Sequence, residues 1–566
     1  MDARHGSDRE VPSAAPNGAA RTVVLLLALF LLRGVFYCAL FPLWEGFDEY
    51  SHFAFVQHVA EMGSLPLAAQ TRVSREIEES LKLVPLPWLL RDLPPPHLTH
   101  DAYWRLPEQE RSRRQDELRS MPADWSRQPA GRELLIYEAQ QPPLYYWLLA
   151  PALRLASNIA LPARVMFLRL LSMLLASISI PLAFFAAERV FGDRRIAVGI
   201  TALIAVMPEL MVDVCRVGND SLGLLVYSLL IYQILRFIDD PGRRPAAILL
   251  GLILGLGLLT KAYFLTGVAA LCAILACTVL FNRRGCKNAV AHGILALGLA
   301  ALTSGWWYWR NRALTETWSG LMQDVELRKV SPVDLFRNIP RVDWRAAFDS
   351  TFFSHIWFGN WSFLQVRSWI YHSYRDLALL SLLGILILIA ASWLKQCARF
   401  TFVARRDYLL PIILIYASFW LGLSYHILIT FTASGSSSSA GWYLYGVIVA
   451  EILVFAAGLF ALLPARLRPW ILPVTTASFA LLDLYTVHFL FVPYYAGLIA
   501  HRTNGALAAF VATSVRREDL WSIFSRLVAN KYPLNVPLLL VIWAFYLGAT
   551  VALVVMSFRP ESKRRQ

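Results

Sequence analysis

Charged residues are scarce in this sequence. Asp, Glu, Lys and Arg make up 16% of its 566 residues, whereas hydrophobic residues make up 57%. Because soluble globular domains carry about a quarter charged residues, this shortage excludes an ordinary soluble protein and places the chain in the membrane class. The charge that remains is mainly basic, with a formal net charge of +14. We attribute it to Lys and Arg in cytosolic loops, which orient membrane helices, and not to nucleic-acid binding.

Cysteine and regular metal-ligand patterns are scarce as well. The six Cys residues include no C-x-x-C pair, so neither a disulfide framework nor a zinc site is indicated. His97 and His100 with Asp101 are metal-ligand residue types, but their spacing is not diagnostic. The apolar run that begins at Thr22 has no convincing small-residue cleavage site, which argues against a cleaved signal peptide.

Long apolar runs, in contrast, are abundant. A spanning helix needs about 20 apolar residues, and about twelve segments qualify: 22–42, 166–187, 196–215, 221–238, 245–260, 263–281, 289–309, 377–394, 408–432, 442–463, 469–491 and 535–557. The segment 144–153 ends early at Arg154, so we predict that it is interfacial or re-entrant. The predicted fold is an all-α polytopic membrane protein with about twelve transmembrane helices and a long first outer loop.

The basic connectors between these segments predict the orientation. Placing them in the cytosol puts both termini inside. This topology gives a disordered cytosolic tail over 1–21, a transmembrane catalytic module over 22–465 and a C-terminal transmembrane region over 466–566. Two long segments, 44–165 and 310–376, then lie outside. Loops of such length are functional or disordered, so candidate catalytic and binding residues are expected at the outer face.

Acidic side chains follow the first span, in the segment 44–52 (WEGFDEYSH). One carboxylate of the Asp48–Glu49 pair can act as a general base on an acceptor hydroxyl, and the other can tune its pKa or help to hold a cation. In a helix, Asp48 and His52 would share a face. The plainer alternative is a solvated acidic start of a helix.

Two further segments carry polar residues at membrane boundaries. The segment 138–146 (EAQQPPLYY) has two prolines that open an aromatic helix, which indicates either a site or an aromatic anchor at the membrane surface. The segment 208–221 (PELMVDVCRVGNDS) holds acids that are costly at the interface unless they are paired or functional. Its alternative is a helix stop followed by an N-cap at Asn219 or Asp220.

Cationic residues occupy two other turns. Lys261 interrupts an apolar run and can bind a lipid phosphate, or it can be a snorkelling side chain in a tight turn. Arg310 follows four aromatic residues at the end of a span, where a guanidinium suits phosphate recognition and an aromatic belt is the alternative. The serine-rich stretch 435–443 leads into a span that holds Glu451, a functional candidate or a satisfied structural acid.

Taken in order, these segments resemble the GT-C superfamily of membrane glycosyltransferases. The similarity is to bacterial enzymes that resemble protein O-mannosyltransferases and lipid A aminoarabinose transferases, and it covers about residues 20–465. It is carried by 48–49 (DE), 142–146 (PPLYY), 218–221 (GNDS), 259–261 (LTK), 308–311 (YWRN), 358–361 (FGNW) and 441–443 (GWY). The last motif usually reads Gly-Arg-Tyr, and here Trp442 stands in the place of the Arg.

The resemblance implies a polyprenyl-phosphate sugar donor used at the outer face. Asp48 maps to the family's base or metal-linked acid, with Glu49 beside it, and Asp220 maps to the second acid. A divalent cation between Asp48 and Asp220 is left open. The donor phosphate is expected at Lys261, Arg310 and Tyr443. The substrates are expected at the following residues: His52, Gln141, Tyr145, Asn219 and Asp220.

These expectations combine into one predicted function. The chain is predicted to be a hexosyl- or pentosyltransferase of a bacterial inner membrane that glycosylates a cell-envelope glycan, lipid or protein. Its partners are membrane lipids, the donor and the acceptor, and no nucleic acid. A transporter or flippase of lipid-linked saccharides is the first alternative, although it predicts an internal duplication of the spans, which we do not find. A structural assembly factor is the second, and it would tolerate Ala at Asp48, Asp220 and Lys261 together.

Overall fold

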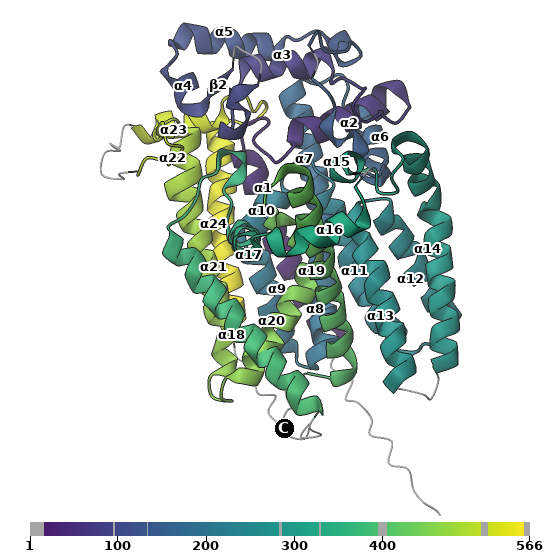
Figure 1. The fold of residues 1–566 in the computed structure, drawn as a ribbon. Helices are drawn as coiled ribbons and strands as arrows, with labels where there is room; N and C mark the ends of the chain where they lie inside the picture. Colours follow the sequence, from purple (N-terminus) through teal and green to yellow (C-terminus); the bar gives the residue numbers. More distant parts are fainter. Residues whose placement is uncertain are drawn as a thin grey trace, which may run out of the picture.

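The computed structural model describes residues 16–93, 97–132, 134–281, 286–327, 330–393, 404–510 and 519–559. Most of the predicted tail 1–21 lies outside these residues. Long helices run side by side, and a layer of short helices covers one end of the bundle (Figure 1). The long helices are α1 (Pro16–Leu40), α7 (Leu161–Ser177), α8 (Ser179–Phe191), α9 (Arg194–Val206), α11 (Asp220–Asp239), α12 (Arg244–Leu258), α13 (Leu265–Phe281), α14 (Cys286–Thr315), α18 (Ser368–Trp393), α19 (Arg406–Ser434), α20 (Ile448–Leu462), α21 (Arg468–Thr486) and α24 (Val536–Phe558).

The predicted fold class is confirmed. In the described part of the chain, ten helical stretches are long and apolar enough to cross a membrane. An eleventh candidate is the pair α9 and α10 (Pro208–Val214), which is bent by 63°. The apolar helix α12 is shorter than the others. All the segments predicted from hydropathy are therefore helical, and α6 (Leu144–Leu155), which covers the segment predicted not to span, is not among the candidates.

The break between α9 and α10 is stabilised by a buried ion network. The break leaves backbone carbonyls at the end of α9 without helical partners inside the bundle, where unsatisfied polar groups are costly. Arg33 of α1 donates to the carbonyls of residues 205–206 and pairs with Asp483 of α21 at 2.9 Å. Tyr37 and Tyr546 donate to the same carboxylate at 2.5 and 2.7 Å. Both members of the Arg33–Asp483 pair are fully buried, so the network ties α1, α9, α21 and α24 together at the break.

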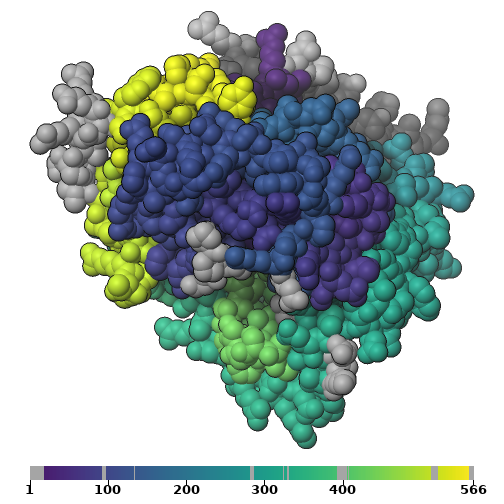
Figure 2. Space-filling view, turned by 90° about the horizontal axis from the view of Figure 1, so that it is seen from above, coloured from purple at the N-terminus to yellow at the C-terminus, as the bar shows by residue number. Residues whose placement is uncertain are grey.

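The segment predicted as a long first outer loop is folded. Residues 49–155, which we call the cap, form short helices and one pair of parallel strands. These elements are α2 (Glu49–Met62), α3 (Arg75–Leu83), β1 (Pro85–Leu86), β2 (Leu98–Thr99), α4 (His100–Arg105), α5 (Glu108–Arg119), η3 (Tyr137–Gln140) and α6 (Leu144–Leu155). Viewed from above, the cap spreads over much of this end of the bundle (Figure 2). A buried ion pair between Glu76 of α3 and Arg164 of α7 holds it there.

The C-terminal helices belong to the same bundle. The predicted boundary at residue 465 falls in the turn between α20 and α21. Helix α24 packs against α1 and α9, and α21 packs against α9. Helices α21 and α24 thus support the helices that carry the cap.

Candidate active site

The chain turns sharply between α1 and α2, and Asp48 lies in this turn. It is the N-terminal neighbour of α2 and has left-handed backbone angles, with φ 50° and ψ 18°. A non-glycine residue in this region is held by its surroundings, and such residues cluster at functional sites. The Asp48 side chain does not cap α2. Within the described residues its carboxylate has no hydrogen-bond or ion-pair partner, so it is free to accept a proton.

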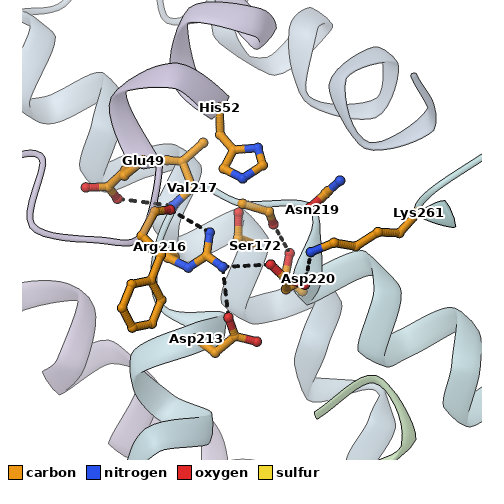
Figure 3. A network of polar contacts seen from close by, with 12 residues as sticks. Glu49, His52, Ser172, Asp213, Arg216, Val217, Asn219, Asp220 and Lys261 are labelled. Carbon is orange, nitrogen blue, oxygen red and sulfur yellow. Dashed lines mark hydrogen bonds and ion pairs between the residues drawn. The ribbon is translucent and has the colours of Figure 1, made fainter. Parts of the chain in front are cut away.

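Charged groups surround this carboxylate. Burial raises the pKa of Asp48 to about 6, against the attraction of Arg216 and Lys261, which lowers it, while Asp220 adds to the rise. A carboxylate with this pKa is mostly ionised at neutral pH and is a stronger base than an ordinary aspartate. Figure 3 shows the network beside it.

Arg216 is the centre of the network. Its guanidinium donates to Asp213 at 2.9 Å, to Asp220 at 2.6 Å and to the backbone carbonyl of Phe47 at 2.9 Å. The turn that carries it needs glycine at position 218, because a Cβ there would lie 2.2 Å from an Arg216 nitrogen. The guanidinium therefore joins the turn before Asp48 to the turn between α10 and α11.

Lys261 completes the network from the turn after α12. Its ammonium donates to the second oxygen of Asp220, so cations hold both oxygens of that carboxylate. It also lies 5.3 Å from the centre of the Tyr443 ring. The structure thus brings Lys261 and Tyr443, two of the predicted phosphate ligands, together. The third, Arg310, lies on α14 over the Trp307 ring, and within the described part of the chain no contact joins it to this network.

Glu49, predicted as the partner of Asp48, has a different environment. Arg169 of α7 donates to its two oxygens at 2.7 and 2.5 Å, and the backbone N–H of Val217 donates at 3.1 Å. The carboxylate is fully buried. These three hydrogen bonds from two partners occupy the Glu49 carboxylate, so it ties α2 to α7 and to the turn at 216–218. Asp48 and Glu49 are neighbours in sequence, but only Asp48 is free.

The predicted substrate residues 141, 145 and 219 are bonded to the same turns. The backbone N–H of Gly218 donates to the Tyr145 hydroxyl at 2.9 Å. The Asn219 amide donates at 3.3 Å both to Gln141 and to the carbonyl of Thr260. Asn219 stands at the N-cap position of α11, yet its side chain does not cap that helix. Asn219 joins three separate motifs at one point. Its side-chain carbonyl oxygen, Oδ1, is buried without a partner in the described residues.

His52 faces a second carboxyl group. Its ring contacts the Tyr146 hydroxyl at 2.9 Å, and its other nitrogen lies 4.0 Å from Glu138. Burial, together with Arg216, lowers the pKa of His52 well below its usual value, so the ring is neutral near pH 7. Burial and the charge of Asp48 raise the pKa of Glu138 to about 8. Glu138 is therefore mainly protonated at neutral pH.

Aromatic rings form one wall beside Asp48. The indole of Trp442 stacks on Phe47 at 4.3 Å and contacts Phe358 at 5.2 Å. The backbone of Phe358 and Gly359 donates to the buried carboxylate of Glu209 on α10, at 3.0 and 3.4 Å. The segment 358–361 thus lies beside the candidate site, and position 442, where the resemblance implied an Arg, has a stacked Trp.

The sequence comparison supports the same family as these motifs. Residues 140–309 match the family model of dolichyl-phosphate-mannose-protein mannosyltransferases. This match confirms the resemblance drawn from the motifs, and it covers Gln141, Tyr145, the 218–220 turn and Lys261. Among solved structures, ArnT from Cupriavidus metallidurans bound to undecaprenyl phosphate is similar at 16% identity, with a TM-score of 0.42, over 96% of this chain and 78% of that chain. No curated protein matches the chain.

Glu138, like Arg216, is a residue of the candidate site that the motifs did not single out. It precedes the two prolines of the matched segment, and its oxygen facing His52 is buried without a hydrogen bond to any described residue. The sequence showed an acid beside a membrane entry helix. It did not show that this acid is buried against Asp48, because that depends on how η3 packs on α2.

The residues present do not fit a metal ion. Both oxygens of Asp220 already face a cation, so a metal ion shared with Asp48 would lie beside Arg216 and Lys261 and be repelled by them. No group of three His, Cys, Asp or Glu side chains among the described residues is arranged to hold a metal. At the other candidate, the His100 ring contacts Glu45 at 3.1 Å. We therefore derive no step through a metal.

Proposed function

We propose that this membrane protein transfers a sugar from a polyprenyl-phosphate donor to a hydroxyl group of a cell-envelope glycan, lipid or protein. The observation that carries the proposal is the unpaired carboxylate of Asp48, close to the cations Arg216 and Lys261, which are themselves paired with Asp220. The backbone of Asp48 is held in the left-handed region. The family match over 140–309 supports the reaction class. The basic connectors favour the outer face for the cap and both termini in the cytosol. The resemblance to bacterial enzymes favours a bacterial inner membrane.

Asp48 acts as the general base. It removes the proton of the acceptor hydroxyl while that oxygen attacks the anomeric carbon of the donor. The bond from the anomeric carbon to the phosphate oxygen breaks, and polyprenyl phosphate leaves with the electron pair. The pKa of about 6 keeps Asp48 mostly ionised at pH 7 and still able to take up the proton.

Lys261 stabilises the leaving phosphate, and Asp220 positions Lys261. The ammonium is held between the Asp220 carboxylate and the Tyr443 ring. Preorganised charge of this kind favours the negative charge that develops on the phosphate. Arg310 remains a predicted second phosphate contact. The polyprenyl tail lies against the apolar helices, which explains why the transferase is embedded in the membrane.

Glu49 and Glu138 take separate roles. Glu49 is a positioning residue, because Arg169 and the backbone of Val217 occupy its carboxylate. Glu138, neutral near pH 7, donates a hydrogen bond to a sugar hydroxyl. His52, also neutral, shapes the same side of the site with Gln141 and Tyr145.

Sugar transfer in membranes tests the proposal. Membranes with equal amounts of wild type and Asp48→Asn protein receive a radiolabelled pool of polyprenyl-phosphate sugars. The expected result is labelled envelope material with wild type and none with the folded variant. Normal transfer by the variant would show that Asp48 is not the base. Movement of intact lipid-linked sugar across the membrane, with the phosphate bond unbroken, would favour the flippase.

A further inference from the structure

A polar cavity lies at the end of the bundle opposite the cap. It has a volume of 340 Å³ and is lined by Phe185, Glu188, Arg189, Tyr232, Asp239, Arg405 and Tyr408. Asp239 ends α11, the helix that Asp220 begins. At 1.5 Å per residue the two carboxylates lie about 28 Å apart along the helix axis, so this cavity is separate from the candidate active site. Its volume is in the range of small-ligand pockets, about 300–1,000 Å³.

Three helices form its walls. Phe185, Glu188 and Arg189 come from α8, and the other residues come from α11 and from the start of α19. Phe185 lies one helical turn farther from the C-terminal end of α8 than Arg189, and its ring is exposed on the helix surface. The polar groups lie at the helix ends. An apolar depth below a polar rim is the arrangement of a lipid-binding site at a membrane interface.

Half of the charge in the cavity is already paired. Arg189 forms an ion pair with Asp239, and the Tyr408 hydroxyl donates to the same carboxylate. Glu188 has no ion-pair partner within the described residues, and neither does Arg405. Arg405 lies beside Gly192, the C-cap of α8, at ordinary van der Waals distance. The Arg405 guanidinium lies over the Tyr408 ring, 6.0 Å from its centre. One carboxylate and one guanidinium therefore remain without a counter-charge in the described residues.

We propose that this cavity binds the phosphoethanolamine headgroup of a membrane phospholipid. The Arg405 guanidinium takes the phosphate, for which its planar donors are suited. The Glu188 carboxylate takes the ammonium. The Tyr232 ring is not part of this contact, because the Arg189 guanidinium already lies over it at 5.7 Å. An acyl chain lies along Phe185. The proposal does not depend on sugar transfer at Asp48.

The charge balance distinguishes ethanolamine from other headgroups. A headgroup with only a negative charge would meet the Glu188 carboxylate without compensation, and like charges at a binding surface are unfavourable. A choline headgroup carries the positive charge but has no N–H group to donate to Glu188. Only a headgroup with an ammonium donor and a phosphate satisfies both unpaired groups.

Melting temperatures of the purified, delipidated full-length protein test the proposal. The probes are dioleoyl phosphatidylethanolamine, phosphatidylcholine and phosphatidylglycerol, and free phosphoethanolamine, because a ligand of the folded state raises the melting temperature with its concentration. The variants are Glu188→Gln and Arg405→Gln. Arg195→Gln is the matched control, since Arg195 is an exposed cation at the same end of the bundle and is not a lining residue of the cavity.

The expected result is a concentration-dependent stabilisation of wild type and control by phosphatidylethanolamine above the other two lipids. Loss of one charge-assisted hydrogen bond predicts about tenfold weaker binding in each variant. In Glu188→Gln, phosphatidylethanolamine and phosphatidylcholine should become equal. Equal stabilisation of wild type by phosphatidylglycerol, or unchanged binding in both variants, overturns the proposal. Equal stabilisation by free phosphoethanolamine identifies a soluble ligand and overturns the lipid assignment.

Discussion

Replacing Glu138 with Gln tests whether the second carboxyl group works in its neutral form. Burial and Asp48 raise the pKa of Glu138 to about 8, whereas the pKa of Asp48 is raised to about 6. Catalysis needs Asp48 ionised and Glu138 protonated. Activity is therefore lost as pH falls through about 6 and as pH rises through about 8, with the maximum between these values.

The size of each loss follows from the two pKa values. At pH 7 about nine-tenths of Asp48 is ionised and about nine-tenths of Glu138 is protonated. At pH 9 only about a tenth of Glu138 keeps its proton, so wild-type transfer should be about tenfold slower than at pH 7. Glu138→Gln keeps a hydrogen-bond donor that does not ionise. Its activity should hold from pH 7 to pH 9 and still fall about tenfold from pH 7 to pH 5.

Initial rates of sugar transfer at donor concentrations well below KM, which report kcat/KM and hence the pKa values of the free enzyme, check this prediction between pH 5 and pH 9. Glu138→Ala, which lacks the donor, should be slow throughout. Glu108→Gln is the matched control, because Glu108 is an exposed acid of the cap and its replacement should leave the profile unchanged. The reasoning is refuted if Glu138→Gln keeps the alkaline loss, or if wild type does not slow between pH 7 and pH 9.

Three further predictions concern the base, the phosphate contact and the membrane network. Asp48→Asn should reduce kcat about 10²–10⁴-fold, as expected for loss of a general base. It should not lower the melting temperature at pH 7, because burial of the ionised carboxylate, which raises its pKa, opposes folding. Lys261→Met should lower kcat/KM about 10²–10³-fold, the effect of removing one preorganised donor to a developing anion, and Lys261→Arg should restore part of it in the same transfer assay. Asp483→Leu should destabilise the protein by about 3–5 kcal/mol, because it leaves the Arg33 charge buried and unpaired. The double replacement with Arg33→Leu should cost less than Asp483→Leu alone, as measured by unfolding in mild detergent.

Each of these predictions has a contradicting outcome. A large loss of stability in Asp48→Asn would mean that its carboxylate has a structural partner. Full activity of Lys261→Met would move the phosphate contact elsewhere, with Arg310 the next residue to replace. A double variant at positions 33 and 483 that is less stable than Asp483→Leu would show that Arg33 stabilises the break at 205–206 independently of the ion pair.

Hydropathy was sufficient to predict the helices. Each apolar run must satisfy its backbone polar groups internally when it lies in a membrane, so a run of sufficient length specifies a helix regardless of its neighbours. The segment 196–215 shows the limit of this argument. It reads as one span, but Pro208 opens a new helix at a 63° bend. That bend is tolerated because Arg33, far away in sequence, donates to the freed carbonyls.

The ordered motifs also indicated most residues of the site. Asp48, Asp220 and Lys261 were predicted from residue type and from their position at the ends of apolar runs, and the structure brings them together. Arg310 was predicted by the same criterion, yet its guanidinium lies over Trp307. A position at a span end specifies depth in the membrane, but it does not specify which side of the helix faces the site.

What the sequence by itself determined was the membrane class, the order of the helices and the candidate charges at their ends, because these depend on local composition. Only the tertiary structure decided which charges are free. Glu49 is occupied by Arg169, which lies 120 residues away, whereas its neighbour Asp48 is unpaired among the described residues. Glu138 is neutral near pH 7 because burial and the charge of Asp48 raise its pKa. Burial and charge partners arise from contacts between distant segments, and no local pattern encodes them.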